Sequence, residues 1–273
     1  MNEKIDPKPF VKWAGGKRQL IQKLIEFAPE NFNNYFEPFL GGGALFFELS
    51  KNNKINKCYL NDSNSLLINS YKTIKEKPTE LIKELKNGKY KNEKEAFLKI
   101  RSEEPVDLVK ATARFIYLNK TSFNGLYRVN SKGKFNVPFG KYTNPTICDE
   151  RNILAVNKAL QKDELLNVDF DKAVGKAKKG DFVYFDPPYA SLNSASFTKY
   201  TKNDFNEKDQ KRLFETFVKL DKKGCFVMLS NSHVPSILDL YKNFNIKTVN
   251  ATRMINCKAG GRGKIKEVVV TNY

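Results

Sequence analysis

Four consecutive residues, Asp186-Pro187-Pro188-Tyr189, form the most specific chemical pattern in this 273-residue chain. The amine of a nucleobase is a poor nucleophile, because its lone pair is delocalised into the ring. A carboxylate and a rigid proline carbonyl that accept its two N–H bonds would favour a tetrahedral nitrogen and release that lone pair. The tyrosine ring offers a face on which an extruded base can stack. Two prolines could also simply end a strand, but that explains neither the acid nor the aromatic residue.

Two more candidate positions follow strand-like runs of apolar residues. A triple glycine, Gly41–Gly43, comes soon after residues 35–39, and Asp62 comes after residues 58–60. Ligands of open α/β sheets bind at the carboxyl ends of the strands. A glycine turn there lets the backbone approach a ligand, and a carboxylate can bind the hydroxyls of a ribose. Three glycines also occur in ordinary tight turns, so the turn alone decides nothing.

Other common chemistries fit the sequence less well. Phe46 occupies the last glycine position of a G-x-G-x-x-G dinucleotide fingerprint, which argues against NAD. Around Gly16-Lys17, Val11 replaces the first glycine of the phosphate-binding loop and Arg18 replaces its Ser or Thr, which argues against ATP. The four cysteines are irregularly spaced without a C-x-x-C pair, which predicts reduced thiols and no structural zinc. His233 is the only histidine, and no G-x-S-x-G elbow accompanies it. A carboxylate-bound nuclease metal is the one metal chemistry that counting residues leaves open.

These candidate residues need a sheet to bring them together, and the pattern around them predicts one. Residues 35–39 and 58–60 are expected strands, and residues 44–49 and 63–74 are expected helices. This order fits a βαβ unit of a doubly wound sheet. The pattern returns later in the chain, with strands expected at 165–168, 182–185 and 225–229, helices at 206–221 and 234–243, and an antiparallel pair at 244–251 and 267–272.

The middle of the chain has a different character. Residues 71–120 are helical in pattern and rich in lysine, with breaks at Pro78, Gly88 and Pro105. Residues 127–137 read as a β-hairpin around a polar glycine turn. We therefore predict an α/β domain formed by residues 1–70 and 166–273, into which a mainly helical domain of residues 71–165 is inserted.

Composition favours a cytoplasmic protein with a polyanionic partner. Lys and Arg total 48 against 30 Asp and Glu, a net charge of +18, although only eight of the basic residues are Arg and an AT-rich genome would also raise the lysine content. No window reaches the roughly 18 apolar residues of a membrane span, and residues 1–7 lack the apolar core of a signal peptide.

Several motifs in this order resemble the Dam type of DNA adenine-N6 methyltransferase, which depends on S-adenosylmethionine. The resemblance covers residues 9 to 273. It rests on Asp186–Tyr189 and Phe36–Gly43, together with the segments Pro9–Arg18, Phe123–Asn130, Phe135–Tyr142 and 263–272. It implies a Rossmann-like methyltransferase sheet whose inserted domain recognises the target. The expected reaction is methyl transfer to N6 of adenine in double-stranded DNA, within GATC and on a flipped base, with S-adenosylhomocysteine as product and no metal.

The resemblance also implies roles for individual residues. Trp13 and Lys17 would lie near the methionine part of the cofactor, and Asp62 would hold its ribose. The expected cofactor-binding residues are Trp13, Lys17, Glu37, Gly41, Gly43, Asp62, Asp169, Phe170 and Asp186. Asp186, Pro187, Pro188 and Tyr189 would hold the target base. Trp13 could instead be a core residue, and Asp169 a helix N-cap.

In the inserted domain, Arg128 and Lys12 match positions that contact guanines, which a cation reads best in the major groove. The expected DNA-binding residues are Lys12, Phe123, Asn124, Leu126, Arg128, Pro138 and Tyr142. Phe123, Leu126 and Pro138 could alternatively form the small core of the hairpin. The polar stretch 190–203 is a hypothetical loop that closes over the flipped base.

Two other functions remain open at this stage. An RNA or free-base amino-methyltransferase also uses an Asp-Pro-Pro-Tyr motif, although A-form RNA hides the major groove that Arg128 would read. A catalytically silent DNA-binding repressor could share the fold. The sequence predicts a monomer, and it leaves open whether the protein serves restriction–modification, acts alone or protects a phage.

Overall fold

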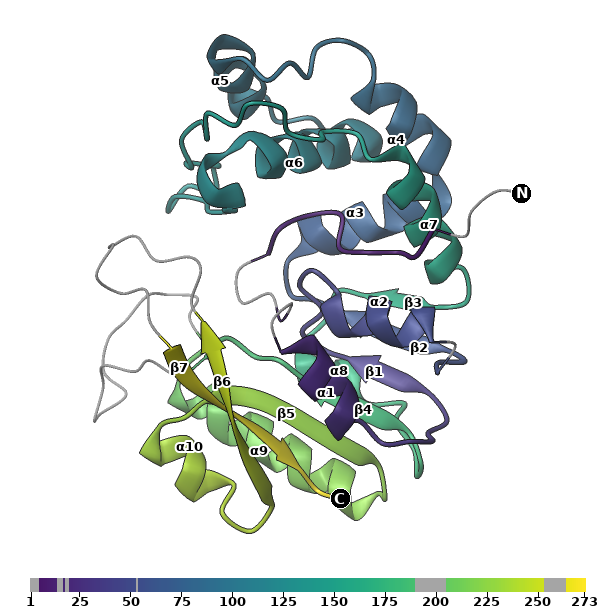
Figure 1. Cartoon of the computed structure of the whole chain (residues 1–273), viewed down its shortest axis with the longest axis vertical. Helices are drawn as coiled ribbons and strands as arrows, with labels where there is room; N and C mark the ends of the chain where they lie inside the picture. Colours follow the sequence, from purple (N-terminus) through teal and green to yellow (C-terminus); the bar gives the residue numbers. More distant parts are fainter. Residues whose placement is uncertain (1–4, 14–16, 18–19, 53, 190–204, 253–263) are drawn as a thin grey trace. The chain divides into compact units, whose positions relative to one another are not determined.

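The computed structural model describes residues 5–13, 17, 20–52, 54–189, 205–252 and 264–273 (Figure 1). Two compact units make up the chain. The helical unit comprises residues 1–16, 41–52 and 64–167, and the sheet unit comprises residues 17–40, 53–63 and 168–273. The predicted division into a domain of residues 1–70 and 166–273 and an inserted domain of residues 71–165 stays a prediction.

A mixed seven-stranded sheet has the order β3-β2-β1-β4-β5-β7-β6. Its strands are β1 (Tyr35–Glu37), β2 (Cys58–Asn61), β3 (Glu164–Leu166), β4 (Phe182–Phe185), β5 (Phe226–Ser232), β6 (Asn245–Thr252) and β7 (Lys264–Thr271). β1 pairs in parallel with β2 and β4, and β4 pairs in parallel with β5. β7 runs antiparallel to both β5 and β6. The expected α/β architecture is therefore confirmed, with β7 inserted between β5 and β6.

The register of the parallel strands brings their polar ends to one edge of the sheet. Glu37 is opposite Leu60 in β2, while Asp186 directly follows β4, whose Phe185 is opposite Leu229 in β5. Because β7 is antiparallel, its first half reaches the same edge, where Glu267 is opposite Ser232. The sheet thus brings together acids that are far apart in the sequence.

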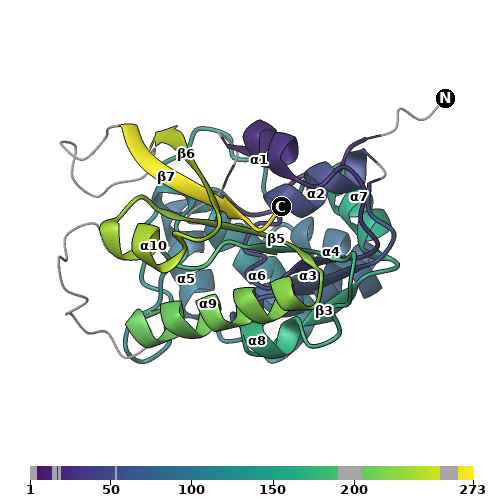
Figure 2. The same cartoon turned by 90° about the horizontal axis from the view of Figure 1, so that it is seen from below.

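The core of the sheet unit consists of apolar side chains from the strands and the helices around them. All four residues of β4 are buried, as expected of a central parallel strand covered on both faces. α8 (Phe170–Ala173) and α9 (Glu207–Lys222) pack on one face, and α1 (Ile21–Phe27) lies on the other (Figure 2). α10 (Pro235–Leu240) adds Ile237 to this core. α9 begins with a capping box formed by Asn206 and Asp209.

The longest helix of the helical unit is α6 (Leu108–Thr121), and other helices pack around it or follow it in the chain (Figure 1). These are α3 (Ser65–Glu76), α4 (Pro78–Leu85), α5 (Lys94–Ser102) and α7 (Glu150–Leu160). α2 (Ala44–Lys51) belongs to the same unit. The breaks predicted at Pro78, Gly88 and Pro105 are confirmed, since each lies at or between helix ends. Pro78 begins α4, where its missing N–H has no helical partner to lose.

The hairpin expected at residues 127–137 is much less regular than predicted, and we call it the reduced hairpin. Val129 and Phe135 make one isolated bridge, and the Asn136 N–H donates to the Arg128 carbonyl. Two short arms without a third strand cannot sustain a regular ladder. Neither α1 nor α7 was expected from the sequence. Among the described residues, no helix is long and apolar enough to cross a membrane.

Candidate active site and nucleic-acid interface

Lys17 and Asp186 form the centre of a buried polar group in the sheet unit. The Lys17 Nζ lies 2.9 Å from Asp186 Oδ1 and 3.8 Å from Glu267 Oε2. Its side chain is only 7% exposed, so the ion pair is largely shielded from solvent. The ammonium also lies 4.3 Å from the centroid of the Tyr189 ring, in cation–π geometry. The structure thus brings two expected site residues, Lys17 and Asp186, into direct contact.

The protonation of Asp186 depends on these neighbours. Burial raises the pKa of its carboxyl group, and the Lys17 ammonium opposes that shift. Glu267 raises the pKa further by charge repulsion, and the Tyr189 hydroxyl lowers it. Lys17 therefore helps to keep Asp186 ionised and able to accept a hydrogen bond.

Glu267 is a site residue that the sequence reasoning missed. Its Oε2 accepts a hydrogen bond of 2.7 Å from the Tyr189 hydroxyl, which fixes the edge of that ring. Burial, Asp186 and Glu267 all raise the pKa of Tyr189, so the phenol stays protonated and donates. An acid next to the apolar run 268–270 was the available signal, but only the strand pairing shows where it lies.

The carbonyl of Pro188, the second proline of the motif, accepts a hydrogen bond from α9. The Gln210 side-chain amide donates to the Pro188 carbonyl at 3.4 Å, and Asn231 donates to Gln210 Oε1 at 3.1 Å. Both amides are buried, at 2% and 0% exposure. The second proline is thus held by α9 and β5, while Pro187 itself is buried.

Asn61, at the end of β2, forms side-chain hydrogen bonds to the segment after β1 and to the segment before α8, at the carboxyl edge of the sheet. Its Nδ2 donates to the carbonyls of Pro38 and Val168 at 2.9 and 3.1 Å, and its Oδ1 accepts from the Val168 N–H at 2.9 Å. These bonds position the expected cofactor residues Glu37, Asp62 and Asp169, each of which is adjacent in sequence to a bonded residue. The Glu37 carboxylate accepts from the buried Tyr35 hydroxyl at 2.9 Å.

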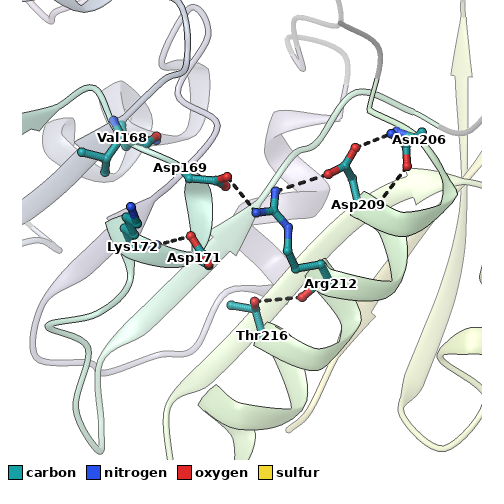
Figure 3. A network of polar contacts seen from close by, with 9 residues as sticks. Val168, Asp169, Asp171, Lys172, Asn206, Asp209, Arg212 and Thr216 are labelled. Atoms are coloured by element: carbon teal, nitrogen blue, oxygen red, sulfur yellow. Dashed lines mark hydrogen bonds and ion pairs between the residues drawn. The ribbon is translucent and has the colours of Figure 1, made fainter. Parts of the chain in front are cut away.

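Asp169 forms an ion pair with Arg212 of α9 (Figure 3), and Arg212 also lies over the Phe170 ring. The Arg212 Nη1 lies 2.7 Å from Asp169 Oδ2, its Nη2 lies 3.3 Å from Asp209 Oδ1, and its guanidinium covers the Phe170 ring at 4.4 Å. Asp169 occupies the N-cap position of α8, but its side chain makes no capping bond and is directed to Arg212 instead. The alternative that Asp169 is a helix N-cap is therefore correct for its position in the chain. It is wrong for the side chain, which binds Arg212 instead of a backbone N–H of α8.

Trp13 lies on the glycine turn within the helical unit. Its ring stacks on Tyr127 with a centroid distance of 5.7 Å and an interplanar angle of 20°. Gly41 and Gly43 have positive φ angles of 50° and 69°, which favour glycine. A Cβ on Gly41 would lie 2.8 Å from Trp13 Cδ1, so only glycine admits the indole there.

The expected DNA-binding residues belong to the helical unit, and several are exposed. Lys12 and Arg128 are exposed, and Phe123 is 49% exposed. Pro138 is exposed as well, whereas Leu126, Asn124 and Tyr142 are half-buried. The hairpin core consists of other residues, including Phe135 at 7% and Val137 at 1% exposure. The alternative that Phe123, Leu126 and Pro138 form this core is therefore wrong for the exposed Phe123 and Pro138, while Leu126 is half-buried.

These residues make specific contacts with one another. The Arg128 Nε donates to Asn136 Oδ1 at 2.8 Å, across the reduced hairpin. The Lys12 ammonium lies 4.7 Å from the Tyr142 ring centroid and 3.5 Å from its hydroxyl. Asn124 has a positive φ of 55° and makes the turn between Phe123 and Gly125 possible.

The chemical character of the expected cofactor residues suits S-adenosylmethionine. The carboxylates of Glu37, at the end of β1, and Asp62, directly after β2, can accept hydrogen bonds from an amine or ribose, and Phe170 offers an aromatic ring near an acid. Lys17, Glu37, Asp62, Asp169, Phe170 and Asp186 belong to the sheet unit, and Trp13, Gly41 and Gly43 to the helical unit. Within the described part of the chain, no cluster of three His, Cys, Asp or Glu residues could hold a metal ion. The hypothetical closing loop 190–203 lies outside the described residues.

Comparison of the sequence with known proteins shows the family to which the chain belongs. The type II methyltransferase M1.LlaDCHI of Lactococcus lactis subsp. cremoris is 48% identical over 279 residues, covering 99% of this chain and 97% of the relative. M.MjaIII of Methanocaldococcus jannaschii, also a type II methyltransferase, is 44% identical, with coverage of 98% and 100%. The DNA adenine methylase of Vibrio cholerae is 34% identical, with coverage of 95% and 94%. The profile of the D12 class N6 adenine-specific DNA methyltransferases matches residues 13–255, and the chain belongs to this family of enzymes.

Proposed function

We propose that the chain methylates N6 of adenine within GATC in duplex DNA, on a base that is flipped out of the helix. Family membership makes it an adenine-specific DNA methyltransferase and implies the use of S-adenosylmethionine. The target sequence and base flipping go beyond membership. The resemblance to Dam-type enzymes supports GATC, and a relative that carries the name DNA adenine methylase is 34% identical.

The observation that carries the catalytic proposal is the contact of Asp186 with Lys17 beside the Tyr189 ring. Asp186 accepts one N–H of the adenine amine, and the Pro187 carbonyl accepts the other. The nitrogen lone pair then leaves conjugation with the ring and becomes nucleophilic. Tyr189, fixed by Glu267, provides the face against which the base stacks. S-adenosylmethionine, when bound, supplies the methyl group.

Binding of the methyl donor is assigned to the residues that the resemblance implies. Trp13 and Lys17 lie near its methionine part, Glu37, Gly41 and Gly43 line the turn beneath it, Asp62 holds the ribose, and Asp169 with Phe170 contacts the adenine. Carboxylates at the ends of parallel strands are suited to ribose hydroxyls. Arg212 holds the Asp169 carboxylate in place for this contact.

Recognition of the target is assigned to the domain of residues 71–165 together with Lys12. Arg128 and Lys12 contact guanines, Leu126 and Pro138 contact thymine methyl groups, and Phe123 and Tyr142 insert into or brace the duplex. The exposure of Lys12, Phe123 and Arg128 supports this assignment, because base readers must be accessible. Asn124 shapes the turn that carries Phe123. The protein acts as a monomer, which light scattering would test.

The decisive experiment treats unmethylated genomic DNA with the purified protein and maps N6-methyladenine by sequencing. Methylation confined to GATC supports the proposal, and methylation of a different motif contradicts the proposed target. Asp186→Ala is the control for chemistry. This variant should lose methyl transfer by at least about 100-fold while it still binds DNA and S-adenosylmethionine. Structured RNA, assayed in parallel, should remain unmethylated.

A further inference from the structure

Residues Lys8 to Lys12 belong to no helix or strand, yet their backbone is held at both ends. Asn119, on α6, accepts the Lys12 N–H through Oδ1 at 2.8 Å and donates from Nδ2 to the Lys12 carbonyl at 2.8 Å. Asn152, on α7, pairs in the same way with Lys8, at 3.0 and 2.9 Å. Two asparagine side chains therefore take the place of a neighbouring strand for this segment.

The two asparagines are equally well buried, at 0% exposure for Asn119 and 2% for Asn152. Phe10 and Val11, which lie between Lys8 and Lys12 in the sequence, are buried at 3% exposure each. A buried amide is retained in a core when its hydrogen bonds are satisfied. Both asparagines therefore contribute to anchoring the segment.

Asn119 has one further bond that Asn152 lacks. Its Nδ2 also donates to the Gly125 carbonyl at 2.9 Å, in the turn that leads to Arg128. The Lys12 side chain lies on this glycine, because a Cβ there would be 2.4 Å from Lys12 Cδ. One buried side chain thus fixes the distance between the Lys12 backbone and the Phe123–Gly125 turn.

We propose that Asn119 is a specificity-determining positioning residue that holds Lys12 and the turn before Arg128 in one fixed geometry. This inference rests on the proposed function, in which Lys12 and Arg128 contact guanines. A cation discriminates between bases only when its backbone is fixed against the groove, since a mobile side chain also reaches other acceptors and phosphates. Asn119 acts through Lys12 and the turn and does not itself contact the base.

The test compares Asn119→Ala with the matched variant Asn152→Ala. The wild type's own methylation motif is mapped first, and kcat/KM is then measured on duplexes that carry each single-base replacement in that motif. Asn119→Ala should lower the discrimination against replaced guanines by about tenfold. Asn152→Ala should lower the thermal stability and leave the discrimination unchanged. A motif other than GATC would contradict the proposed target without affecting this comparison.

A double variant separates positioning from general loosening. If Asn119 acts through Lys12, adding Lys12→Met to Asn119→Ala should cause no further loss of guanine discrimination at the Lys12 position. Should Asn119→Ala fail to fold, Asn119→Ser provides the same comparison, because its hydroxyl is too short for all three bonds. The proposal is overturned if discrimination survives in the folded Asn119 variant, or if all duplexes are weakened equally.

Discussion

Asp186 lies beside Lys17 and is also influenced by the charge of Glu267, so its charge state depends on residues far away in the sequence. Burial raises the pKa of its carboxyl group, Lys17 lowers it, and Glu267 raises it again. The ionised carboxylate accepts an N–H bond from the adenine amine more strongly than the protonated acid does. Catalytic activity should therefore fall as the pH decreases through the pKa of Asp186.

Lys17→Met should move this acid limb to higher pH. Removing the ammonium removes the influence that opposes burial, so the pKa of Asp186 rises further and protonation begins at a higher pH. The measurement is kcat against pH at saturating S-adenosylmethionine, so that weaker cofactor binding does not contribute. Lys17→Arg keeps the charge and should leave the limb near its wild-type position. An acid limb in Lys17→Met that coincides with the wild type would show that the ion pair does not control Asp186.

Trp13 is the only tryptophan, which makes its fluorescence a direct probe of the glycine turn. Gly41→Ala should strain a positive φ, at about 1–2 kcal/mol, and also displace the indole. Gly88→Ala is the matched control, because its φ is +86° and nothing lies within 4 Å of its added Cβ. Both variants should lose stability, but only Gly41→Ala should shift the emission and weaken binding of S-adenosylmethionine. Equal emission in both would show that the Gly41 substitution does not displace the indole, and equal affinity for S-adenosylmethionine would place the glycine turn outside the cofactor site.

Among the elements, the carboxyl ends of β1 and β2 and the segment before α8 depend on one side chain, Asn61. Asn61→Ala leaves the Pro38 carbonyl and both Val168 backbone groups without this partner, so we expect a loss of about 2–3 kcal/mol in unfolding free energy. Affinity for S-adenosylmethionine should fall as well, because Asp62 and Asp169 lose their support. Urea unfolding and calorimetry measure the two effects. Asn33→Ala, at an exposed asparagine whose side chain donates a hydrogen bond of 3.3 Å to the Lys179 carbonyl, should change neither.

The local elements could largely be predicted from sequence because each has its own signal. The apolar run Phe182–Phe185 followed by an acid predicted β4 together with the position proposed to be catalytic. The antiparallel pair at the end of the chain was also predicted. Its insertion beside β5 was not, since the order of strands depends on contacts between residues some 40 positions apart.

The unpredicted parts of the site share one physical reason. Lys17 contacts Asp186 across 169 positions, and Arg212 contacts Asp169 across 43. Glu267 and Asn61 likewise act through partners that only the folded sheet brings near. Residue types reveal what a side chain can do, while pairings such as these come from topology.

For the molecule as a whole, the distribution of charge is more informative than the total of +18. Residues 108–148 contain seven Lys and Arg and no Asp or Glu. This stretch includes α6 and most of the expected DNA-binding residues. A lysine content set by genome composition alone would not by itself exclude acids from this stretch. We infer that part of the positive charge serves binding of the phosphate backbone.

Salt dependence of DNA binding can separate the two sources of charge. Lys132 and Lys134, exposed at the turn of the reduced hairpin, form one pair, and Lys219 and Lys222, exposed on α9 of the sheet unit, form the other. Each phosphate contact steepens the slope of log K against log salt by about 0.9, because counterions are released. Replacing the hairpin pair with alanine should make the slope shallower by about 1–2 on every DNA sequence alike, whereas the α9 pair should leave it unchanged. Equal effects of the two pairs would mean that the excess charge attracts DNA only through its total, and that the hairpin lysines have no special contact with phosphate.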